Sequence, residues 1–319
     1  MNIDYTDVLG HMHVPLDDIY ACEKLAETIL DLEILREALA LPGDHRALLA
    51  FADHDGSLSR AIPQIPAMEA YDPDTFSIQA AEEGIISTVV KTARRWLDHF
   101  QAGLYHLRHW ILAAAGLASF VTGREARAAY DNAQTWKKFG VKDPEAYKKV
   151  RVPAITAVAL LALSVMAKST PVAIKKCLEL RLPTDTSGRG DYMKKVKDIF
   201  QEVAQVDIDK LGLRTMSRED AGKSARDLGY TPDGVVKLVG EVKSAIDELQ
   251  RCNFIPQQLE DLSRSVEAGT SNGRVALAWI MKVIAQTLHF AISDVREGGH
   301  TVKQLNDDYA HVLQQHGHD

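Results

Sequence analysis

Apolar residues recur every three or four positions through the run of residues 76–139, which is the period of one face of an α-helix. No proline interrupts this run. The repeating apolar positions in its first half are Ile85, Ile86, Val89, Val90, Trp96, Leu97, Phe100 and Leu104. Basic residues fall mainly between these positions. The pattern therefore predicts a long central amphipathic helix with a basic flank, bending near Gly103 or Gly116.

The same period occurs in most of the remaining chain. Residues 16–41 form a helical pattern that ends at Pro42-Gly43, and Asp17 and Asp18 fall in its first turn. Further helices are expected over 153–167, from Pro171, and over 191–203, 232–250, 256–268, 274–294 and 302–315. Alternating strand patterns are scarce. The predicted fold is all-α and multi-helix, with a helical N-terminal appendage and a helical C-terminal half.

Two turn-rich stretches suggest how the chain is divided. Residues 53–74 contain Gly56, Pro63, Pro66 and Pro73, and residues 183–191 read PTDTSGRGD. We interpret the first stretch as a linker and the second as a boundary loop. The expected parts are residues 1–82, 83–183 and 184–319.

Charge is spread unevenly over these parts. The net charge is −7 in total. Residues 1–83 carry 17 acidic against 4 basic residues, whereas residues 84–203 carry 20 basic against 10 acidic residues. The last segment, from residue 204, has 13 basic and 17 acidic residues. This asymmetry predicts an acidic appendage that is attracted to a basic body or to another polyion.

Two uncharged or weakly charged apolar runs require a membrane test. Residues 152–167 are shorter than the roughly 20 residues of a spanning helix. Residues 275–292 are longer but contain Lys282, Gln286 and His289. We interpret both as buried core helices and expect no membrane span. Three scattered cysteines without CxxC spacing indicate reduced thiols.

No complete catalytic or cofactor motif is present. Residues 221–224 read AGKS, like the end of a P-loop, but Ser217 stands where its first glycine belongs and no strand precedes it. No GxSxG, HExxH or GxGxxG pattern occurs. We therefore predict no catalytic residue, no metal ligand and no cofactor.

Histidine residues suggest two weaker hypotheses of a metal-binding site. His99, His106 and His109 share the central helix, where paired imidazoles hold a metal in some proteins, although packing or surface roles are the simpler interpretation. Asp53-His54-Asp55 resembles the central pair of a helical metal-dependent phosphohydrolase. That element lies just before Gly56, so we interpret it as a turn.

The basic flank of the central helix is a candidate polyanion-binding surface. Its residues are Lys91, Arg94, Arg95 and Arg108. Basic side chains contact phosphates, and the aromatic residues of the stretch 91–110 would stack on bases. The alternative is an amphipathic helix whose charges are simply solvated.

The N-terminal segment contains, in order, EKLAETILDLEILREALA, LSRAIPQIPAMEA and AAEEG before the central helix. This layout resembles that of the precursor internal head proteins of giant tailed bacteriophages. It implies that the acidic segment 1–82 is a propeptide, which directs the precursor into the prohead scaffold and is removed by a prohead protease after a small-x-Glu motif. Ala80-Ala81-Glu82 matches that motif, as do residues 67–69 and 21–23.

Three functional hypotheses follow. The first is a non-enzymatic internal virion protein of a large tailed phage. It would be made in the host bacterial cytoplasm, packaged with head or scaffold proteins beside the genome, and possibly ejected with it, touching DNA weakly. The second is a cytoplasmic helical metal-dependent hydrolase that uses His54 and Asp55. The third is a phage-encoded protein that binds a host factor. An ordinary N-terminal helical subdomain, packed permanently on the body, is the alternative to a removable propeptide.

Overall fold

Helices make up nearly all of the chain that the structure describes. The structure is a computed structural model, and it describes residues 16–40, 77–139, 150–152, 157–183, 188–207, 226–228, 232–266 and 271–315. The α-helices are α2 (Asp17–Leu39), α5 (Ile78–Phe139), α6 (Ala157–Leu178), α7 (Arg189–Ala204), α9 (Pro232–Arg251), α10 (Ile255–Val266) and α11 (Ser271–Gln315). The short 3₁₀-helix η4 (Cys252–Phe254) links α9 to α10. The predicted all-α fold is confirmed.

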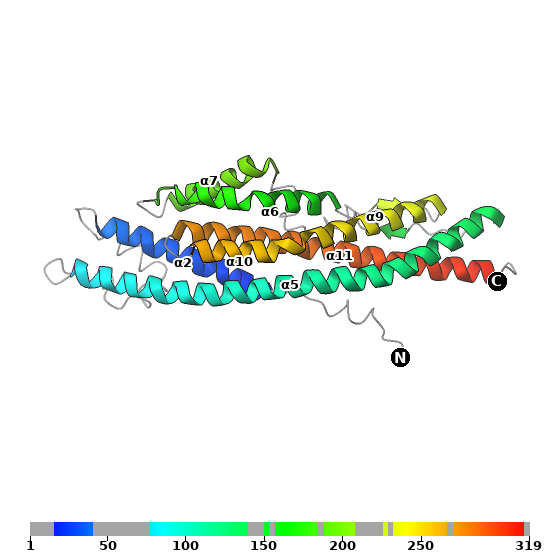
Figure 1. The fold of residues 1–319 in the computed structure, drawn as a ribbon, viewed down its shortest axis with the longest axis horizontal. Helices are drawn as coiled ribbons and strands as arrows, with labels where there is room; N and C mark the ends of the chain where they lie inside the picture. Colours follow the sequence, from blue (N-terminus) through cyan, green and yellow to red (C-terminus); the bar gives the residue numbers. More distant parts are fainter. Residues whose placement is uncertain are drawn as a thin grey trace.

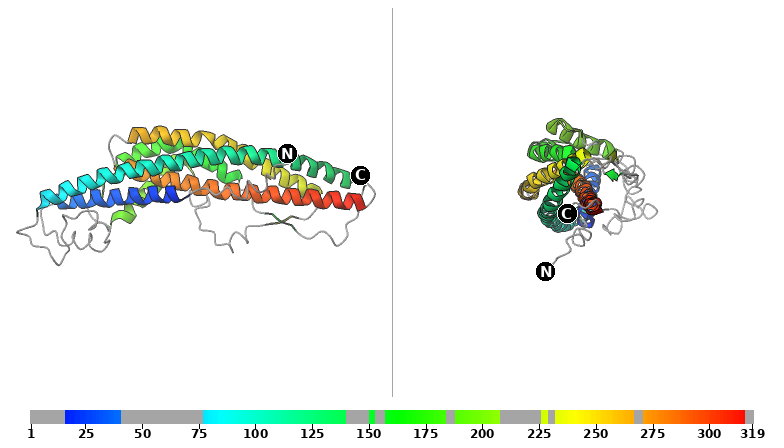
Figure 2. Two further views of the ribbon diagram at one scale, coloured as in Figure 1. Left: turned by 90° about the horizontal axis from the view of Figure 1, so that it is seen from below. Right: turned by 90° about the vertical axis from the view of Figure 1, so that its right-hand side faces the viewer.

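The helices form an elongated bundle (Figure 1). The two longest helices, α5 and α11, run side by side, and α2 packs on both of them near the start of α5. The pair α6 and α7 forms an outer layer on the side opposite α5 (Figure 2). The only sheet within the described residues joins β1 (Val150–Val152) to β2 (Arg226–Leu228) in antiparallel register, with Val150 opposite Leu228.

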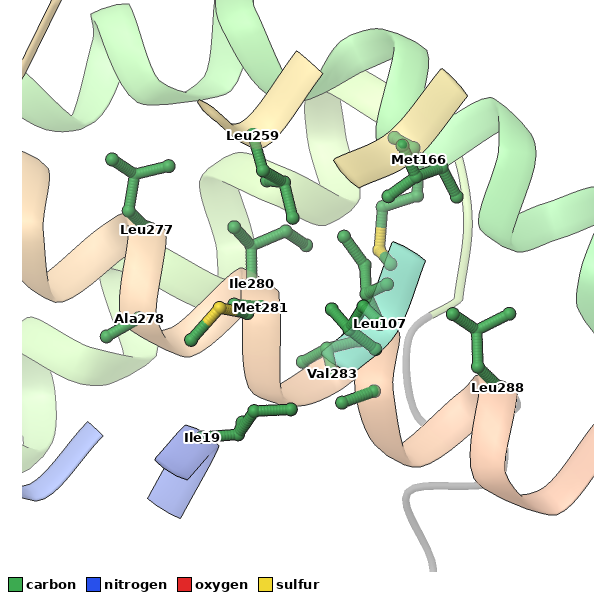
Figure 3. Close-up of a cluster of buried hydrophobic side chains, with 14 of the residues drawn as sticks. Ile19, Leu107, Met166, Leu259, Leu277, Ala278, Ile280, Met281, Val283 and Leu288 are labelled. Atoms are coloured by element: carbon green, nitrogen blue, oxygen red, sulfur yellow. The ribbon is translucent and has the colours of Figure 1, made fainter. Parts of the chain in front are cut away.

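One apolar core connects the described helices. Figure 3 shows part of it, where Ile19 of α2, Leu107 of α5, Met166 of α6 and Leu259 of α10 surround the apolar face of α11 around Ile280. The same cluster includes residues on both sides of the expected boundaries at 82/83 and 183/184. Those boundaries therefore do not separate independent cores among the described residues.

Proline 171 lies inside a helix, although the sequence indicated that it starts one. Helix α6 runs through Pro171 without a break. A proline has no N–H to donate to the carbonyl of the residue four positions earlier, Ala167. Met166, Ala167, Ala173 and Ile174 are all buried around it. Tertiary packing on both sides of the proline holds the two expected helices as one.

Glycine pairs and single glycines also fail to interrupt the long helices. Helix α11 continues through Gly298 and Gly299, where two helices were expected, and α5 continues through Gly103 and Gly116. Gly298, Gly299 and Gly103 are buried. The Cβ position of Gly103 lies 3.2 Å from Ile19 Cγ1, so the small residue allows α2 to approach α5 closely. Packing outweighs the low helix propensity of glycine at the three buried positions, whereas Gly116 is exposed with nothing within 4 Å of its Cβ position.

The most apolar helical segment belongs to the core. Among the described residues, one segment, Ser271–Ser293 of α11, is long and apolar enough to cross a membrane, and 72% of its most apolar window is buried inside the bundle. A core helix passes the same test of length and composition. The structure thus agrees with the interpretation of residues 275–292 as a buried helix.

Substitution of Gly273 is expected to destabilise the fold. A Cβ atom at this position in the first turn of α11 would lie 2.5 Å from Val266 Cγ1 and 3.0 Å from Leu178 Cδ2. Gly273→Ala should lower the unfolding free energy by about 1–2 kcal/mol, because overpacking costs more than the helix propensity gained.

Gly240→Ala is the matched control, since nothing lies within 4 Å of its Cβ position in α9. It should stabilise the protein by about 0.5–1 kcal/mol. Thermal unfolding of both variants measures the difference. A Gly273→Ala protein at least as stable as wild type would contradict the close packing at this helix junction.

Candidate polyanion-binding face

Three of the four predicted polyanion contacts lie together on the surface of α5. Lys91, Arg94 and Arg95 are exposed, and their spacing of three and four residues places them on one side of the helix. No side-chain hydrogen bond or ion pair joins them to another described residue. Their charges are therefore available to a ligand on this side of α5. We call these three residues the α5 basic face.

The fourth predicted contact, Arg108, is already engaged by α10. Its Nη2 donates to Gln257 Oε1 at 2.9 Å and to Glu260 Oε2 at 3.2 Å. Glu260 also pairs with Arg264 at 2.6 Å. Arg108 thus stabilises the contact between α5 and α10, and it is a weaker candidate for polyanion binding than the α5 basic face.

Most aromatic residues of the stretch 91–110 cannot stack on a ligand. Trp96, Phe100 and Trp110 are buried, and the Trp96 and Phe100 rings stack on each other with centroids 4.9 Å apart. The expectation of base stacking is wrong for these three side chains because they form the apolar stripe of α5. Tyr105 is the exception, with 61% of its surface exposed beside His109.

The acidic N-terminal helix pairs with the histidines of α5. Asp18 of α2 places Oδ1 2.9 Å from His99 Nδ1 and Oδ2 3.5 Å from His106 Nε2. Both imidazoles therefore converge on one carboxylate. His109 lies outside this contact, and its ring packs on Tyr105 at a centroid distance of 4.4 Å.

Further carboxylates of α2 pair with two other helices. Arg189 at the start of α7 lies 2.8 Å from Glu27 and 3.1 Å from Asp31, and Lys282 of α11 donates to Glu23 at 2.8 Å. The acidic helix and the basic body attract each other, as the charge asymmetry suggested. These pairs use cations of α7 and α11 and leave the α5 basic face open.

Sequence reasoning did not single out these acidic residues individually. A usable signal was present, because Glu23, Glu27 and Asp31 follow one another at intervals of four residues. That spacing places a row of carboxylates along one side of a helix. Their partners, Arg189 and Lys282, lie far along the chain, and no local pattern indicates them.

Helix α2 is also part of the apolar core. Its buried side chains in the core cluster are Ile19, Cys22, Ala26, Ile29, Leu30 and Ile34. An appendage held by charge alone would not bury this surface. In this structure α2 is therefore packed on the body as part of its core.

The candidate cleavage site lies in the first turns of α5. Ala81 is fully buried, Ala80 is half-buried and Glu82 is exposed. The Ala80 N–H donates to Ser77 Oγ at 3.2 Å, and the Ala81 N–H donates to Ser77 O at 3.0 Å. A protease that binds an extended backbone would have to unwind this turn first.

The described residues contain neither an arranged metal-binding group nor a reactive thiolate. No group of three or more His, Cys, Asp or Glu side chains in the described ranges is arranged to hold a metal ion. Burial raises the pKa of the Cys177 and Cys252 thiols to about 12 and also raises the pKa of Cys22, so all three favour the unreactive thiol form. Residues 53–56, with His54 and Asp55, lie outside the described residues.

Comparison with known proteins found no relative of this chain. No protein-family model, curated protein or solved structure matches the chain.

Proposed function

We propose that this chain is a non-enzymatic internal head protein of a large tailed phage, packaged beside the genome. The observation that carries the proposal is the α5 basic face, with Lys91, Arg94 and Arg95 exposed and unpaired within the described residues. Three cations on one stiff helix suit weak, sequence-independent contact with DNA phosphates. The proposed location inside the phage head rests on the resemblance of the N-terminal layout to precursor internal head proteins.

The all-helical architecture is compatible with this proposal. A bundle with a continuous core and buried thiols gives a stable packaged body. The described surface also includes a groove between α6 and α10. It is open to solvent, unlike the enclosed pockets that usually bind small substrates.

Processing after Glu82 is part of the proposal, in a modified form. Because α2 shares the core with α5 and α11, a cut after Glu82 would leave α2 bound non-covalently to the body. Removing the segment would require the partly unfolded precursor or a partner that replaces α2. We therefore expect cleavage, where it occurs, to take place in the assembling head, where a partner takes the place of α2 on the body.

Protease protection of purified particles tests the location. We expect the chain to be present in DNA-filled heads, to resist added protease while the heads are intact, and to be digested once osmotic shock has opened them. Mass spectrometry of the same particles reads the N-terminus, and a peptide that begins at Glu83 would support processing. Absence of the chain from particles, or its digestion on intact heads, would refute an internal head protein.

DNA binding should depend on the α5 basic face. Replacing Lys91, Arg94 and Arg95 together with alanine is expected to reduce the slope of log affinity against log salt by about 2–3, because each lost phosphate contact removes close to one released counterion. Fluorescence anisotropy with a labelled duplex of arbitrary sequence, at several salt concentrations, measures the slope.

The matched control removes three exposed lysines from the opposite side of the bundle. Lys175 of α6 and Lys194 and Lys195 of α7 are exposed, and α7 lies far from α5 in Figure 1. The control has the same net charge as the test variant. If both triple variants changed the slope equally, binding would depend on net charge and not on the α5 basic face.

A further inference from the structure

An apolar groove lies on the outside of the bundle between α6 and α10. Its volume is about 590 Å³, and it is open to solvent. It is lined by Pro171 of α6 and Phe254 of η4. Helix α10 lines it through Gln257, Gln258, Asp261, Leu262 and Ser265. The groove contacts neither the α5 basic face nor the paired acidic residues of α2.

An exposed apolar stripe borders this groove. Leu161, Val165 and Val172 of α6 are 53%, 41% and 55% exposed. Their spacing of four and seven residues places them on one face of the helix. Lys168 lies on the same face, and its Nζ is 5.8 Å from the ring centroid of Phe254 in the groove. The convex stripe and the concave groove are therefore neighbours on one surface.

Two polar side chains at the groove have incomplete hydrogen-bond or ion-pair partners. The buried Gln258 Oε1 has no hydrogen-bond partner within the described chain. Asp261 accepts a hydrogen bond from Gln257 at 3.1 Å, yet its side chain remains 60% exposed, and the nearest ion-pair partner, Arg264, is 3.9 Å away. Helix α10 thus presents the exposed carboxylate of Asp261 at the groove, and α6 presents the ammonium group of Lys168.

We propose that the groove binds the α6 stripe of a second copy of this chain, in a dimer with twofold symmetry. A twofold contact requires a surface that is complementary to itself. This surface meets the requirement, because it carries both the stripe and the groove, and both a cation and an anion. In the dimer, Val172 of each copy enters the groove of the other, and each Lys168 faces the opposite Asp261.

The contact is small, so the dimer is weak. With three exposed apolar side chains from each copy, the contact is smaller than a standard specific interface, and a dissociation constant on the order of 10–100 μM is expected. The inference does not depend on the proposed location in a phage head.

Sedimentation equilibrium of the full chain over a concentration series tests the dimer. The weight-average mass of the wild type should rise above 35.2 kDa with concentration and approach twice that value. Val172→Glu should remain at the monomer mass. Val90→Glu is the matched control, because Val90 is 48% exposed on α5 and does not line the groove, and it should associate like the wild type.

A charge exchange tests the orientation of the two copies. Lys168→Glu and Asp261→Lys should each weaken association about 3- to 10-fold, and the double variant should return to within about twofold of the wild type. A wild-type chain that stays monomeric up to millimolar concentration would overturn the proposal, whatever other protein the groove binds. So would a dimer that tolerates Val172→Glu or is lost equally in Val90→Glu.

Discussion

A chain that begins at Glu83 is expected not to fold by itself. Without α2, the apolar surfaces of α5 and α11 that cover Ile19, Ile29 and Leu30 would face water, and each such aliphatic side chain contributes about 1.5–3 kcal/mol when buried. The cations Arg189 and Lys282 would lose their carboxylate partners as well. We expect the fragment 83–319 to aggregate or to lack a cooperative thermal transition, as measured by circular dichroism and size-exclusion chromatography.

Co-expression of residues 1–82 with residues 83–319 is the complementary experiment. The two chains should copurify as one folded complex, because the contacts of α2 with the body do not depend on the covalent connection. Leu30→Asp in the short chain should abolish copurification, since Leu30 is fully buried, whereas Glu27→Gln should only weaken it. A fragment 83–319 as stable as the intact protein would show instead that α2 is dispensable and would support its removal during maturation.

Phe100→Ala should produce the largest loss of stability of any single truncation considered for α5. Phe100 is fully buried and stacks on Trp96, which is 1% exposed. Replacing a buried phenylalanine with alanine typically costs about 3–5 kcal/mol, which combines lost burial with the cavity that remains. Chemical denaturation in urea, with the slope of the transition compared between variants, measures this change.

Tyr105→Ala is the control for helix propensity, because both substitutions place alanine in the same helix. Tyr105 is 61% exposed, so its truncation should change stability by less than about 0.5 kcal/mol. Equal effects of the two substitutions would contradict the assignment of Phe100 to the inner face and Tyr105 to the outer face of α5.

The spacing of apolar residues by itself determined the class of fold. Together with proline and glycine residues, it also determined the approximate bounds of the helices that begin or end at them. Helix α2 ends just before Pro42-Gly43, and α9 begins at Pro232, as predicted. The exposed positions of Lys91, Arg94 and Arg95 also followed from the period, because residues between apolar positions face away from the core. The charge asymmetry indicated an attraction between the first helix and the body.

Tertiary structure alone decided where helices continue and which residues meet. Pro171, Gly298 and Gly299 reduce helix stability locally. The burial of the residues on both sides of Pro171, and of the two glycines themselves, outweighs that cost, and only the packed structure contains that information.

The same holds for the role of α2. Its pairs with α5, α7 and α11 join residues 81 or more positions apart, such as His99 with Asp18 and Lys282 with Glu23. Helical periodicity is a property of a few consecutive turns and carries no information on such distant partners. The sequence therefore predicted an acidic helix, whereas packing made it part of the core.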